Sequence, residues 1–497
     1  MAIKRYTAIA DNTITNQYNE GLSRRMSDSN AGLADSLEIF KLYGQIQETT
    51  VEQSRILIKF PVNEVGLEST VRTIKQDRDA GIIPESGSVK FFMKLFDIAH
   101  PDTYPRNYKI VAHPLTRDWD EGLGIDLDNH LDYGQSSWVS SSTTTAWSTE
   151  GGDYNTSYTY EQTFDKGLEN FSVDVTDYVE DVLDSTLNSG NNYGFILKLS
   201  SSYENDANSY YTKKFSARGS EFFFNRPIIE AQWDSSMKDD RSNFFYSSSL
   251  AEAEDNLNTI YLYNNIGGRL KNLPNIGTSN VYVSFYLSSG SLPTGNALSL
   301  VEDGTHVLSS APTVVTGGYV STGIYSASVS ITGTAETIHD VWHDGNGTVF
   351  YTGSIYPETR VLDGTTRTND YYVSITNLKT VYENNETARF RIYSRLKGWA
   401  PTIYTRAVAE PQMYIPTSGS YEIIRIIDNY KVIEHATGSI KYTELSYDGS
   451  GSYFDFDMSI LEPGYSYAIR LAFYDDFISD YKTVDKQFKF RVEKYET

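Results

Sequence analysis

The chain has no cysteine and only 7 histidines, although it carries 39 tyrosines and 23 phenylalanines among its 497 residues. Without cysteine, neither disulfide bonds nor thiolate zinc sites can form. No apolar run approaches the roughly 18 residues that a membrane-spanning helix needs. The basic start of the chain is not followed by the apolar stretch of a secretory signal. We therefore expect a protein that is made in a cytoplasm, does not insert into membranes and is released by lysis rather than secretion.

Basic residues are fewer than acidic residues. Asp and Glu number 65 against 42 Lys and Arg, which gives a net charge of −23. The acidic residues are scattered through the chain and are not gathered in a tail. Such a surface repels nucleic acid and anionic membranes, so we expect no nucleic-acid partner.

What the chain does contain is a long series of strand-like runs. They extend from about residue 54 to residue 492 and are separated by clusters of Gly, Asn, Asp and Ser. The clearest runs lie at residues 54–60, 88–96, 192–199, 280–286, 370–375 and 487–492. This pattern predicts an all-β protein built from modules in series.

Domain boundaries follow from changes in composition. Polar and acidic residues dominate from 234 to 256, where apolar periodicity stops, which is typical of a linker. Before residue 50 the sequence has turn and cap residues, with a short helix or an edge strand at 33–40. The predicted regions are an irregular N-terminal arm at 1–50, a β-sandwich at 51–235, a linker at 236–257, and two further β modules at 258–365 and 366–497.

One acidic loop has the composition of a calcium site. Asp126, Asp128 and Asp132 lie close together, with Asn129 between them and Gly134 after them. Calcium takes six to eight oxygen ligands in a flexible geometry. The loop lacks the distal glutamate of a helical calcium hand, so a solvated acidic loop is the alternative interpretation. No other cofactor is expected.

Aromatic residues in the Ser- and Thr-rich stretch 135–158 suggest a second kind of site. Trp138, Trp147 and Tyr154 could stack on sugar rings if their faces are exposed. Aromatic residues in β modules also serve as core residues or cross-strand pairs. Both interpretations remain open from the sequence.

The sequence from His339 to His343 has the histidine spacing of a metalloprotease helix, but Asp340 stands where that motif needs Glu. Strand-like neighbours and the turn residues 345–347 favour a strand that runs into a hairpin. No phosphate loop, dinucleotide fingerprint or nucleophile elbow is present. Choosing two carboxylates as a glycosidase pair would be arbitrary in so acidic a chain, so we expect no enzymatic activity.

From Asp118 onward the first region resembles the jelly-roll modules called DNRLRE domains, which are related to a family of carbohydrate-binding modules. The similarity rests on the order of short motifs: WDEG at 119–122, Trp138, Trp147, glycines 151–152, FSVDVTDYV at 171–179, NYGFIL at 192–197, FSAR at 215–218 and RPIIE at 226–230. The run RILIKF at 55–60 fits their first core strand. The resemblance implies a jelly-roll sandwich with a short helix after residue 175, which Thr176 or Asp177 could cap.

Other segments resemble virion structural proteins of marine tailed bacteriophages. The stretches are DNTITN at 11–16, ADSLEIF at 34–40, LSYD at 445–448, GSYF at 451–454 and LEPGYSY at 461–467. VTGGY at 315–319 and TGIYS at 322–326 resemble immunoglobulin-like modules of such proteins. The resemblance implies a jelly-roll sandwich followed by two immunoglobulin-like β-sandwiches, and it carries over no catalytic residues.

The expected function is that of a non-enzymatic structural component of a virion, in the neck, tail or baseplate or as capsid decoration. It would assemble in the host cytoplasm and contact copies of itself and other virion proteins through repeated interfaces. The long entry at residues 1–50 is expected to dock on a neighbouring subunit. The alternative is an adhesin or host-recognition fibre that binds host surface glycan through the Trp138 and Trp147 loop; a polysaccharide-degrading enzyme is a third and weaker alternative.

Overall fold

The computed structural model describes residues 2–68, 71–127, 135–249, 251–288, 295–300, 312–360, 370–397, 413–475 and 478–495. The chain forms two compact units, Ala2–Asp234 and Ser235–Thr497. Strands account for 42% and helices for 7% of the structure, so the predicted all-β class is confirmed and the architecture is multi-domain. None of the helices within the described ranges is long and apolar enough to cross a membrane.

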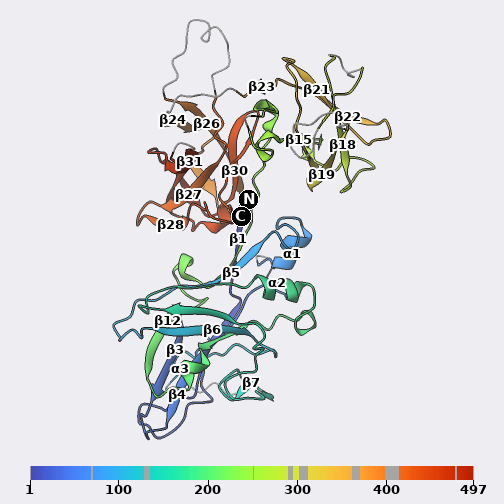
Figure 1. Cartoon of the computed structure of the whole chain (residues 1–497). Helices are drawn as coiled ribbons and strands as arrows, with labels where there is room; N and C mark the ends of the chain where they lie inside the picture. Colours follow the sequence, from blue (N-terminus) through green and yellow to red (C-terminus); the bar gives the residue numbers. More distant parts are fainter. Residues whose placement is uncertain are drawn as a thin grey trace. The chain divides into compact units, whose positions relative to one another are not determined.

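The first unit contains two large sheets with the orders β1-β13-β5-β10 and β12-β3-β4-β11-β6-β9, with β2 also paired to β4, and a small two-stranded sheet β7-β8 (Figure 1). Its strands are β1 Ile3–Thr7, β2 Ala10–Thr15, β3 Ser36–Tyr43, β4 Val51–Lys59, β5 Lys90–Leu95, β6 Tyr108–Pro114, β7 Ser140–Ser142, β8 Thr145–Ala146, β9 Tyr160–Phe164, β10 Phe171–Asp174, β11 Phe195–Leu199, β12 Tyr210–Ser216 and β13 Ile228–Gln232. Its helices are α1 Ile74–Asp79, α2 Thr176–Leu183 and α3 Ser201–Glu204, with 3-10 turns at Asn188–Gly190 and Phe223–Asn225.

The alternation of apolar residues builds the core of this sandwich. In β5, Phe91, Met93 and Leu95 are fully buried, whereas the residues between them are partly exposed. In β10, Phe171 and Val173 are buried and alternate with exposed residues. This is the period of two that a strand with one core face requires.

The prediction of an irregular arm at residues 1–50 is wrong, because this segment supplies three strands. β1 pairs antiparallel with β13, and β2 and β3 both pair with β4. The polar residues of β2 looked like turn residues, but they are buried with their hydrogen bonds satisfied. Asn12, for example, donates to Ser136 Oγ at 2.8 Å and accepts from the Ala31 amide at 3.0 Å. Because the segment is part of the sandwich, the expectation that it docks on a neighbouring subunit loses its basis.

The predicted strand and short helix around residue 175 are present as β10 and α2. The predicted cap is not. Thr176 is already the first helical residue, and Val175 at the N-cap position makes no side-chain hydrogen bond. Asp174, one residue earlier, accepts from the Thr176 amide at 3.0 Å instead. A carboxylate two residues before the amide provides the same kind of local support as an Asx turn.

The second unit begins with a segment that we call the connector, residues 235–247, with a 3-10 turn at Asp240–Ser242 and strand β14 at Phe245–Tyr246. The prediction of a free linker at 236–257 is wrong for the residues described there. The Asp239 amide donates to the Tyr447 carbonyl at 3.0 Å. Asp240 accepts from the Tyr447 hydroxyl and from the Thr259 amide, both at 2.7 Å. Asp240 is thus an acceptor for two other segments, whereas Glu252, Glu254 and Asp255 are exposed.

The second sandwich follows the connector and a further 3-10 turn at Glu254–Asn256. Its strands are β15 Asn258–Tyr263, β16 Asn265–Ile266, β17 Arg269–Leu270, β18 Val281–Tyr286, β19 Val315–Ser321, β20 Ile324–Val329, β21 Ile338–His343, β22 Val349–Ile355 and β23 Glu358–Thr359. The main sheet has the order β15-β20-β19-β18-β21-β22. It surrounds one core that includes Trp342 and Tyr325, both fully buried.

Strand β19 changes partner at its glycines. Val315 to Gly317 pair with β18, whereas Gly318 to Ser321 pair with β20. A Cβ atom on Gly317 would lie 2.7 Å from the Ser326 carbonyl oxygen. A residue with a side chain would therefore push the strands apart where the sheet changes direction.

The third sandwich has one sheet of order β24-β26-β30-β29 and one of order β25-β33-β31-β27-β28, with β32 also paired to β31. Its strands are β24 Tyr371–Ile375, β25 Val381–Glu383, β26 Thr387–Leu396, β27 Gly419–Arg425, β28 Tyr430–Ile433, β29 Ser446–Asp448, β30 Gly451–Asp457, β31 Ser466–Asp475, β32 Asp480–Thr483 and β33 Phe488–Glu493, with a 3-10 turn at Met458–Ile460. Near the start of β31, the Tyr467 hydroxyl donates to the Glu462 carbonyl at 2.8 Å.

Replacing Tyr467 by phenylalanine should lower the free energy of unfolding by about 1 kcal/mol, because the partly buried Glu462 carbonyl loses its partner. Urea unfolding of the full chain, followed by tryptophan fluorescence, measures the change. Tyr356, which is 70% exposed, provides the matched Tyr→Phe control, and its variant should unfold as the parent does. Equal stability of the two variants would contradict a structural role for the Tyr467 hydroxyl.

Candidate binding groove

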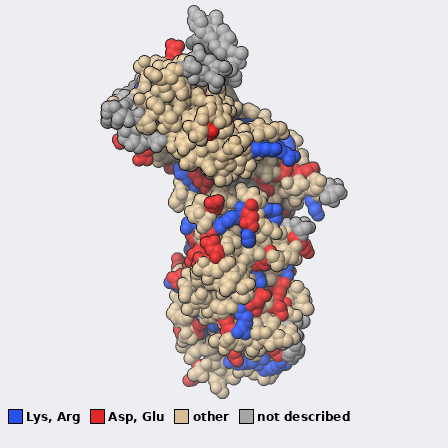
Figure 2. Space-filling view, turned by 90° about the vertical axis from the view of Figure 1, so that its right-hand side faces the viewer, with Lys and Arg blue, Asp and Glu red and all other residues tan. Residues whose placement is uncertain are grey.

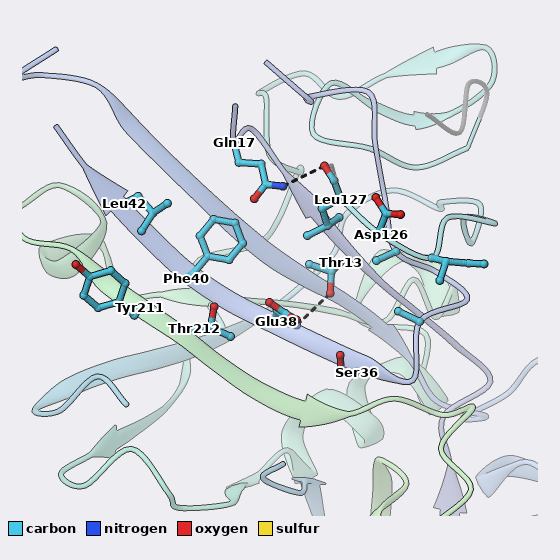
Figure 3. Close-up of a pocket in the computed structure, with 13 residues that line it drawn as sticks. Thr13, Gln17, Ser36, Glu38, Phe40, Leu42, Asp126, Leu127, Tyr211 and Thr212 are labelled. Atoms are coloured by element: carbon cyan, nitrogen blue, oxygen red, sulfur yellow. Dashed lines mark hydrogen bonds between the residues drawn. The ribbon is translucent and has the colours of Figure 1, made fainter. Parts of the chain in front are cut away.

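A groove of about 480 Å³ lies on a face of the larger sheet of the first unit (Figure 3). Its floor is formed by alternate residues of β3, namely Ser36, Glu38, Phe40 and Leu42. The remaining lining residues are Thr13, Gln17, Ala31, Ala34, Ile125, Asp126, Leu127, Tyr211 and Thr212. The volume falls within the range of small-molecule sites in proteins.

A β-bulge shapes one wall of the groove. Tyr210 pairs with Lys41 and Lys213 pairs with Ile39, so two residues of β12, Tyr211 and Thr212, stand opposite Phe40. A bulge of this kind breaks the alternation of side chains and redirects them. It brings both residues to the groove, and Tyr211 is 53% exposed there.

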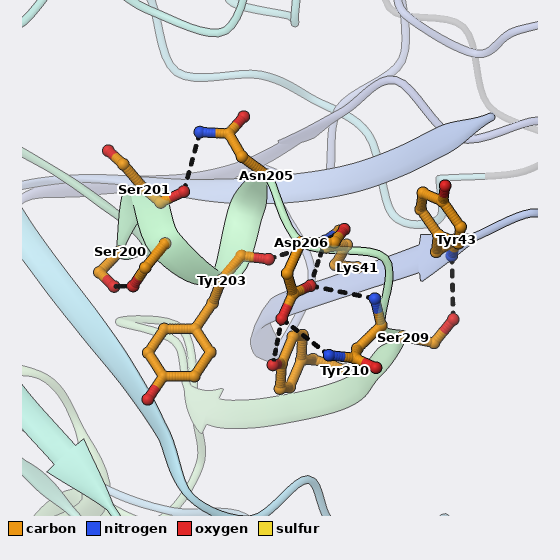
Figure 4. A network of polar contacts seen from close by, with 11 residues as sticks. Lys41, Tyr43, Ser200, Ser201, Tyr203, Asn205, Asp206, Ser209 and Tyr210 are labelled. Atoms are coloured by element: carbon orange, nitrogen blue, oxygen red, sulfur yellow. Dashed lines mark hydrogen bonds and ion pairs between the residues drawn. The ribbon is translucent and has the colours of Figure 1, made fainter. Parts of the chain in front are cut away.

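The bulge is held by a polar network around the fully buried Lys41 (Figure 4). The Lys41 ammonium donates to the Tyr203 carbonyl at 2.7 Å and to the carboxylate of Asp206 at 2.7 Å. The Tyr210 hydroxyl donates to the same carboxylate at 2.6 Å. Although burial acts to raise it, the pKa of Asp206 lies well below its ordinary value because of these hydrogen bonds. The charged network fixes β3 against β12 next to the bulge.

The opposite end of the groove is closed by residues 125–127. The Gln17 side chain donates to the Leu127 carbonyl at 3.0 Å, and the Ser29 hydroxyl reaches the same carbonyl at 3.3 Å. Upstream, the backbone passes very close to Asn30, because a Cβ on Gly124 would lie 1.9 Å from the Asn30 carbonyl oxygen. Only glycine permits this approach.

A buried carboxylate anchors the start of the same loop. Asp11 is 1% exposed and accepts from the Arg218 amide at 2.6 Å. Arg218 in turn forms an ion pair with Glu121, and the Asp11 amide donates to Glu121 at 2.9 Å. Burial raises the pKa of Asp11 to about 7 against the opposing hydrogen bond from Arg218, and the nearby Glu121 adds to the rise.

The lining of the groove combines acidic and polar residues with apolar ones, and its described residues include no basic group. Its charged members are Glu38 and Asp126, and no Lys, Arg or His is among the described lining residues. The carboxylate of Glu38 is paired with Lys214 at 3.0 Å. The Glu38 amide donates to the Thr13 hydroxyl oxygen at 3.2 Å, which fixes β2 beside β3.

The predicted calcium loop is only partly covered by the structure. Asp126 lines the groove, whereas Asp128 and Asp132 lie outside the described residues. Within the part of the chain that is described, no group of three or more His, Asp or Glu side chains could hold a metal ion. Calcium binding at this loop stays a prediction.

The two tryptophans predicted to stack on sugars are core residues. Trp138 is 4% and Trp147 6% exposed, and they pack in one cluster with Leu57, Trp119 and Ile196. The Trp147 indole N–H donates to the Ser137 carbonyl at 2.9 Å. Neither ring offers a face to solvent, so the expectation of exposed rings is wrong for both. Burial against the sheet is what makes these large residues stabilising in the loop.

A buried ionic cluster holds this tryptophan loop to the sheet. Arg55 donates through Nε and Nη2 to Glu204, both at 3.1 Å, and through Nη1 to the Gly151 carbonyl at 2.8 Å. Lys198 pairs with the same carboxylate at 2.6 Å. The Arg55 guanidinium also lies over the Trp138 ring, 4.9 Å from its centroid. The third predicted sugar-stacking residue, Tyr154, is half-buried and stacks on His113 instead.

The His339 to His343 segment is the predicted strand before a hairpin turn. It forms β21, which pairs with β22 across the turn. Asp340 is fully buried and binds Arg241 of the connector through two hydrogen bonds of 2.7 Å. A carboxylate engaged in this way serves the ion pair and not a metal.

The groove could not be found from the sequence, because the β-bulge that shapes it leaves no signal in the local sequence. The bulge is a shift in register between β3 and β12, and these strands are far apart in the chain. Asp126 alone was identified, for a different chemistry. A hint was present in the adjacent aromatic residues Tyr210 and Tyr211, which cannot both face the core of a regular strand.

Comparisons with known proteins add little to this geometry. No protein-family model matches the chain, and no curated protein matches it. Solved structures similar to it include alpha-2-macroglobulin of E. coli, at 8% identity and a TM-score of 0.16, with 99% of this chain and 26% of that chain covered. A Salmonella alpha-2-macroglobulin variant matches at 9% identity and a TM-score of 0.15, with 94% and 21% covered. The chain thus spans about a quarter of the length of these proteins, and scores this low support no inference about fold or function.

Replacing Lys41 by methionine should lower the free energy of unfolding by about 2 kcal/mol, because buried carbonyl and carboxylate oxygens lose their donor. Denaturant unfolding of the full chain measures the loss. Lys75 of α1 is half-exposed and pairs with the exposed Asp79, so Lys75→Met is the control and should change stability by less than about 0.5 kcal/mol. If both variants lose equally little, the network does not fix the bulge.

Stability should also depend on pH through Asp11. Its pKa rises from 3.8 in the unfolded chain to about 7 in the folded one, so the folded state binds the proton more tightly. The contribution of this group to stability is present below pH 3.8 and is lost as the pH rises to 7, by up to about 1.4 kcal/mol per pH unit. In unfolding free energies measured from pH 4 to 8, Asp11→Asn should remove this part of the slope. An unchanged slope in Asp11→Asn would contradict the assignment.

Proposed function

We propose that this chain is a non-enzymatic structural component of a tailed-phage virion that acts through repeated protein–protein interfaces. The observation that carries the proposal is the scarcity of charge in the second sandwich. Residues 258–357 contain only seven charged residues, whereas Asp, Glu, Lys and Arg make up 22% of the whole chain. Figure 2 shows few blue or red atoms on the face that this sandwich turns to the viewer. Depletion of charge is the compositional mark of the centre of protein interfaces.

The end strand of the main sheet in this sandwich supports the same role. Among the described strands, β22 is the last in the order, and residues 349–356 carry no charge. Val349 is 39% and Tyr351 41% exposed. Soluble monomers usually protect such a strand with lysine, proline or a covering segment. An uncharged end strand is suited to pairing with a strand of another chain.

We further infer that both sandwiches of the second unit are immunoglobulin-like. In the third, the orders β24-β26-β30-β29 and β25-β33-β31-β27-β28 correspond to A-B-E-D and A′-G-F-C-C′. β25 runs parallel to β33, as the first strand does when it crosses to the other sheet. The Tyr467 hydrogen bond to Glu462 has the geometry of a tyrosine corner at the start of strand F. In the second sandwich, the order β15-β20-β19-β18-β21-β22 corresponds to B-E-D and C-F-G joined through β19.

The first unit is proposed to be a jelly roll. Its early strands pair with late ones in a nested pattern: β1 with β13, β3 with β12, β4 with β11 and β5 with β10. A jelly roll arises when a long double strand folds over itself, which produces this nesting. Jelly-roll and immunoglobulin-like modules serve many functions, so the proposal depends on the interface chemistry and on the sequence resemblance, and not on the fold.

Antibody raised against residues 258–497 should label purified phage particles at one fixed position in immunogold electron microscopy. A fixed position is expected because a structural protein occupies equivalent sites set by the symmetry of the particle. Antibody blocked with the same protein fragment is the control. Absence of label on every particle would remove the virion assignment.

Replacing Val349 by lysine should reduce incorporation into particles about tenfold, the change that corresponds to about 1.4 kcal/mol of interface free energy. Val381, at the start of β25, is 41% exposed against 39% for Val349, so Val381→Lys is a matched control that should incorporate normally. Quantitative immunoblots of particles assembled from each variant give the measurement. Normal incorporation of both variants would exclude β22 as the contact.

A further inference from the structure

We propose that Asn346 is a modification site, at which spontaneous deamidation replaces the side-chain amide by a carboxylate and so regulates the end strand β22. Asn346 lies in the turn between β21 and β22, both labelled in Figure 1, and is followed by Gly347. The Asn-Gly pair occurs once in the sequence. The reaction itself is independent of the proposed function, whereas its effect on assembly rests on that proposal.

The reaction needs only the chain and water. The Gly347 amide nitrogen attacks the side-chain carbonyl carbon of Asn346, its proton goes to the departing amide nitrogen, and ammonia is released from a cyclic imide. Water then opens either C–N bond of the imide ring, which gives aspartate from one bond and isoaspartate from the other. Because the nucleophile and the carbonyl belong to neighbouring residues, the first step is intramolecular and gains from proximity.

The turn leaves both reacting groups accessible. Asn346 and Gly347 are exposed, and a Cβ atom on Gly347 would meet no atom of a non-neighbouring residue within 4 Å. Gly347 has a φ of +105°, a conformation that residues with a side chain rarely adopt. Within the described part of the chain, no acceptor binds the Gly347 amide and no group binds the Asn346 side chain. Neither group must break a hydrogen bond before it reacts.

Hydrogen bonds to Asp344 hold both sides of the turn. The Asp344 carboxylate accepts from the Thr348 amide at 2.9 Å and from the Asn346 amide at 2.7 Å. These two amides hold the pKa of Asp344 below its ordinary value, so this carboxylate is ionised at neutral pH. Deamidation would therefore place a second negative charge two residues away from an existing one.

The product would alter the strand that we propose as an interface. Residues 345–357 carry no charge, and Val349 follows Asn346 by three positions and pairs with His343 across the hairpin. A carboxylate at this place opposes burial in an interface, because the centres of interfaces are depleted of charge. Isoaspartate also adds a methylene carbon to the backbone of a hairpin turn, whose length sets the register of its strands. Chains that age before assembly would thus lose the capacity to pair through β22.

The first experiment is incubation of the purified full chain at mildly alkaline pH, with the conversion of each asparagine followed by peptide mass spectrometry. Asn429 is the matched control, because it is also exposed and lies in the turn between β27 and β28. There, however, Tyr430 comes next, and its amide donates to the Asp428 carboxylate at 3.1 Å. Asn346 should convert at least about tenfold faster than Asn429, to both aspartate and isoaspartate. Equal rates, or no conversion of Asn346, would overturn the proposal.

The second experiment measures the incorporation of variants into particles by quantitative immunoblot. Asn346→Asp imitates one product and should incorporate about fivefold less than the parent. Asn346→Ser cannot deamidate and adds no charge, and Asn429→Asp adds the same charge to the third sandwich, so both should incorporate normally. Equal incorporation of Asn346→Asp and the parent would overturn the regulatory role. Fast conversion of Asn346 in a parent chain that enters no particle would support the modification and remove the virion assignment alone.

Discussion

The ammonium group of Lys41 is removed from water and has three oxygens within 2.7 Å, from the Tyr203 carbonyl, the Asp206 carbonyl and the Asp206 carboxylate. A charge buried in this way is tolerated only when it is fully paired, because an unpaired one costs several kcal/mol. The same requirement ties strands together elsewhere. Glu230 of β13, 1% exposed, binds Arg5 of β1 and Lys94 of β5, and Arg55 of β4 binds Glu204 of α3. In a chain without cysteine, these pairs define which strands meet, and the bulge and the groove depend on one of them.

In the second unit, charged residues of the connector also pair with distant residues. Lys238 binds Glu444 of the third sandwich at 2.6 Å, and Arg241, three positions later, binds Asp340 of the second sandwich. Asp240 accepts from Tyr447 of one and Thr259 of the other. Burial raises the pKa of the neighbouring Asp239 to about 6. Lys238, Asp240 and Arg241, which looked like parts of a solvated spacer, thus contact residues that are far away in the sequence.

Local sequence patterns predicted the positions of the strands better than they predicted which strands pair with one another. The alternation in residues 54–60, 88–96, 280–286 and 487–492 identified β4, β5, β18 and β33, because burial of one strand face leaves a period of two in the sequence. β2 escaped notice because its buried face is polar, with Asn12 and Thr13 satisfied by residues remote in the chain. The tryptophan loop was located, but not its burial, since packing of Trp138 depends on Arg55. The groove could not be predicted, because a bulge between β3 and β12 exists only once those strands are paired.

The low charge of the second sandwich has a consequence for the medium in which the chain works. Copies with a net charge of −23 repel one another in dilute buffer, and most of that charge lies outside residues 258–357. At physiological ionic strength the Debye length shortens to about 8 Å, so acidic surfaces that do not touch cease to oppose each other. Screening by salt does not weaken a contact that is made through uncharged residues. Added salt would therefore favour self-association of this protein, whereas it weakens complexes whose affinity rests on opposite charges.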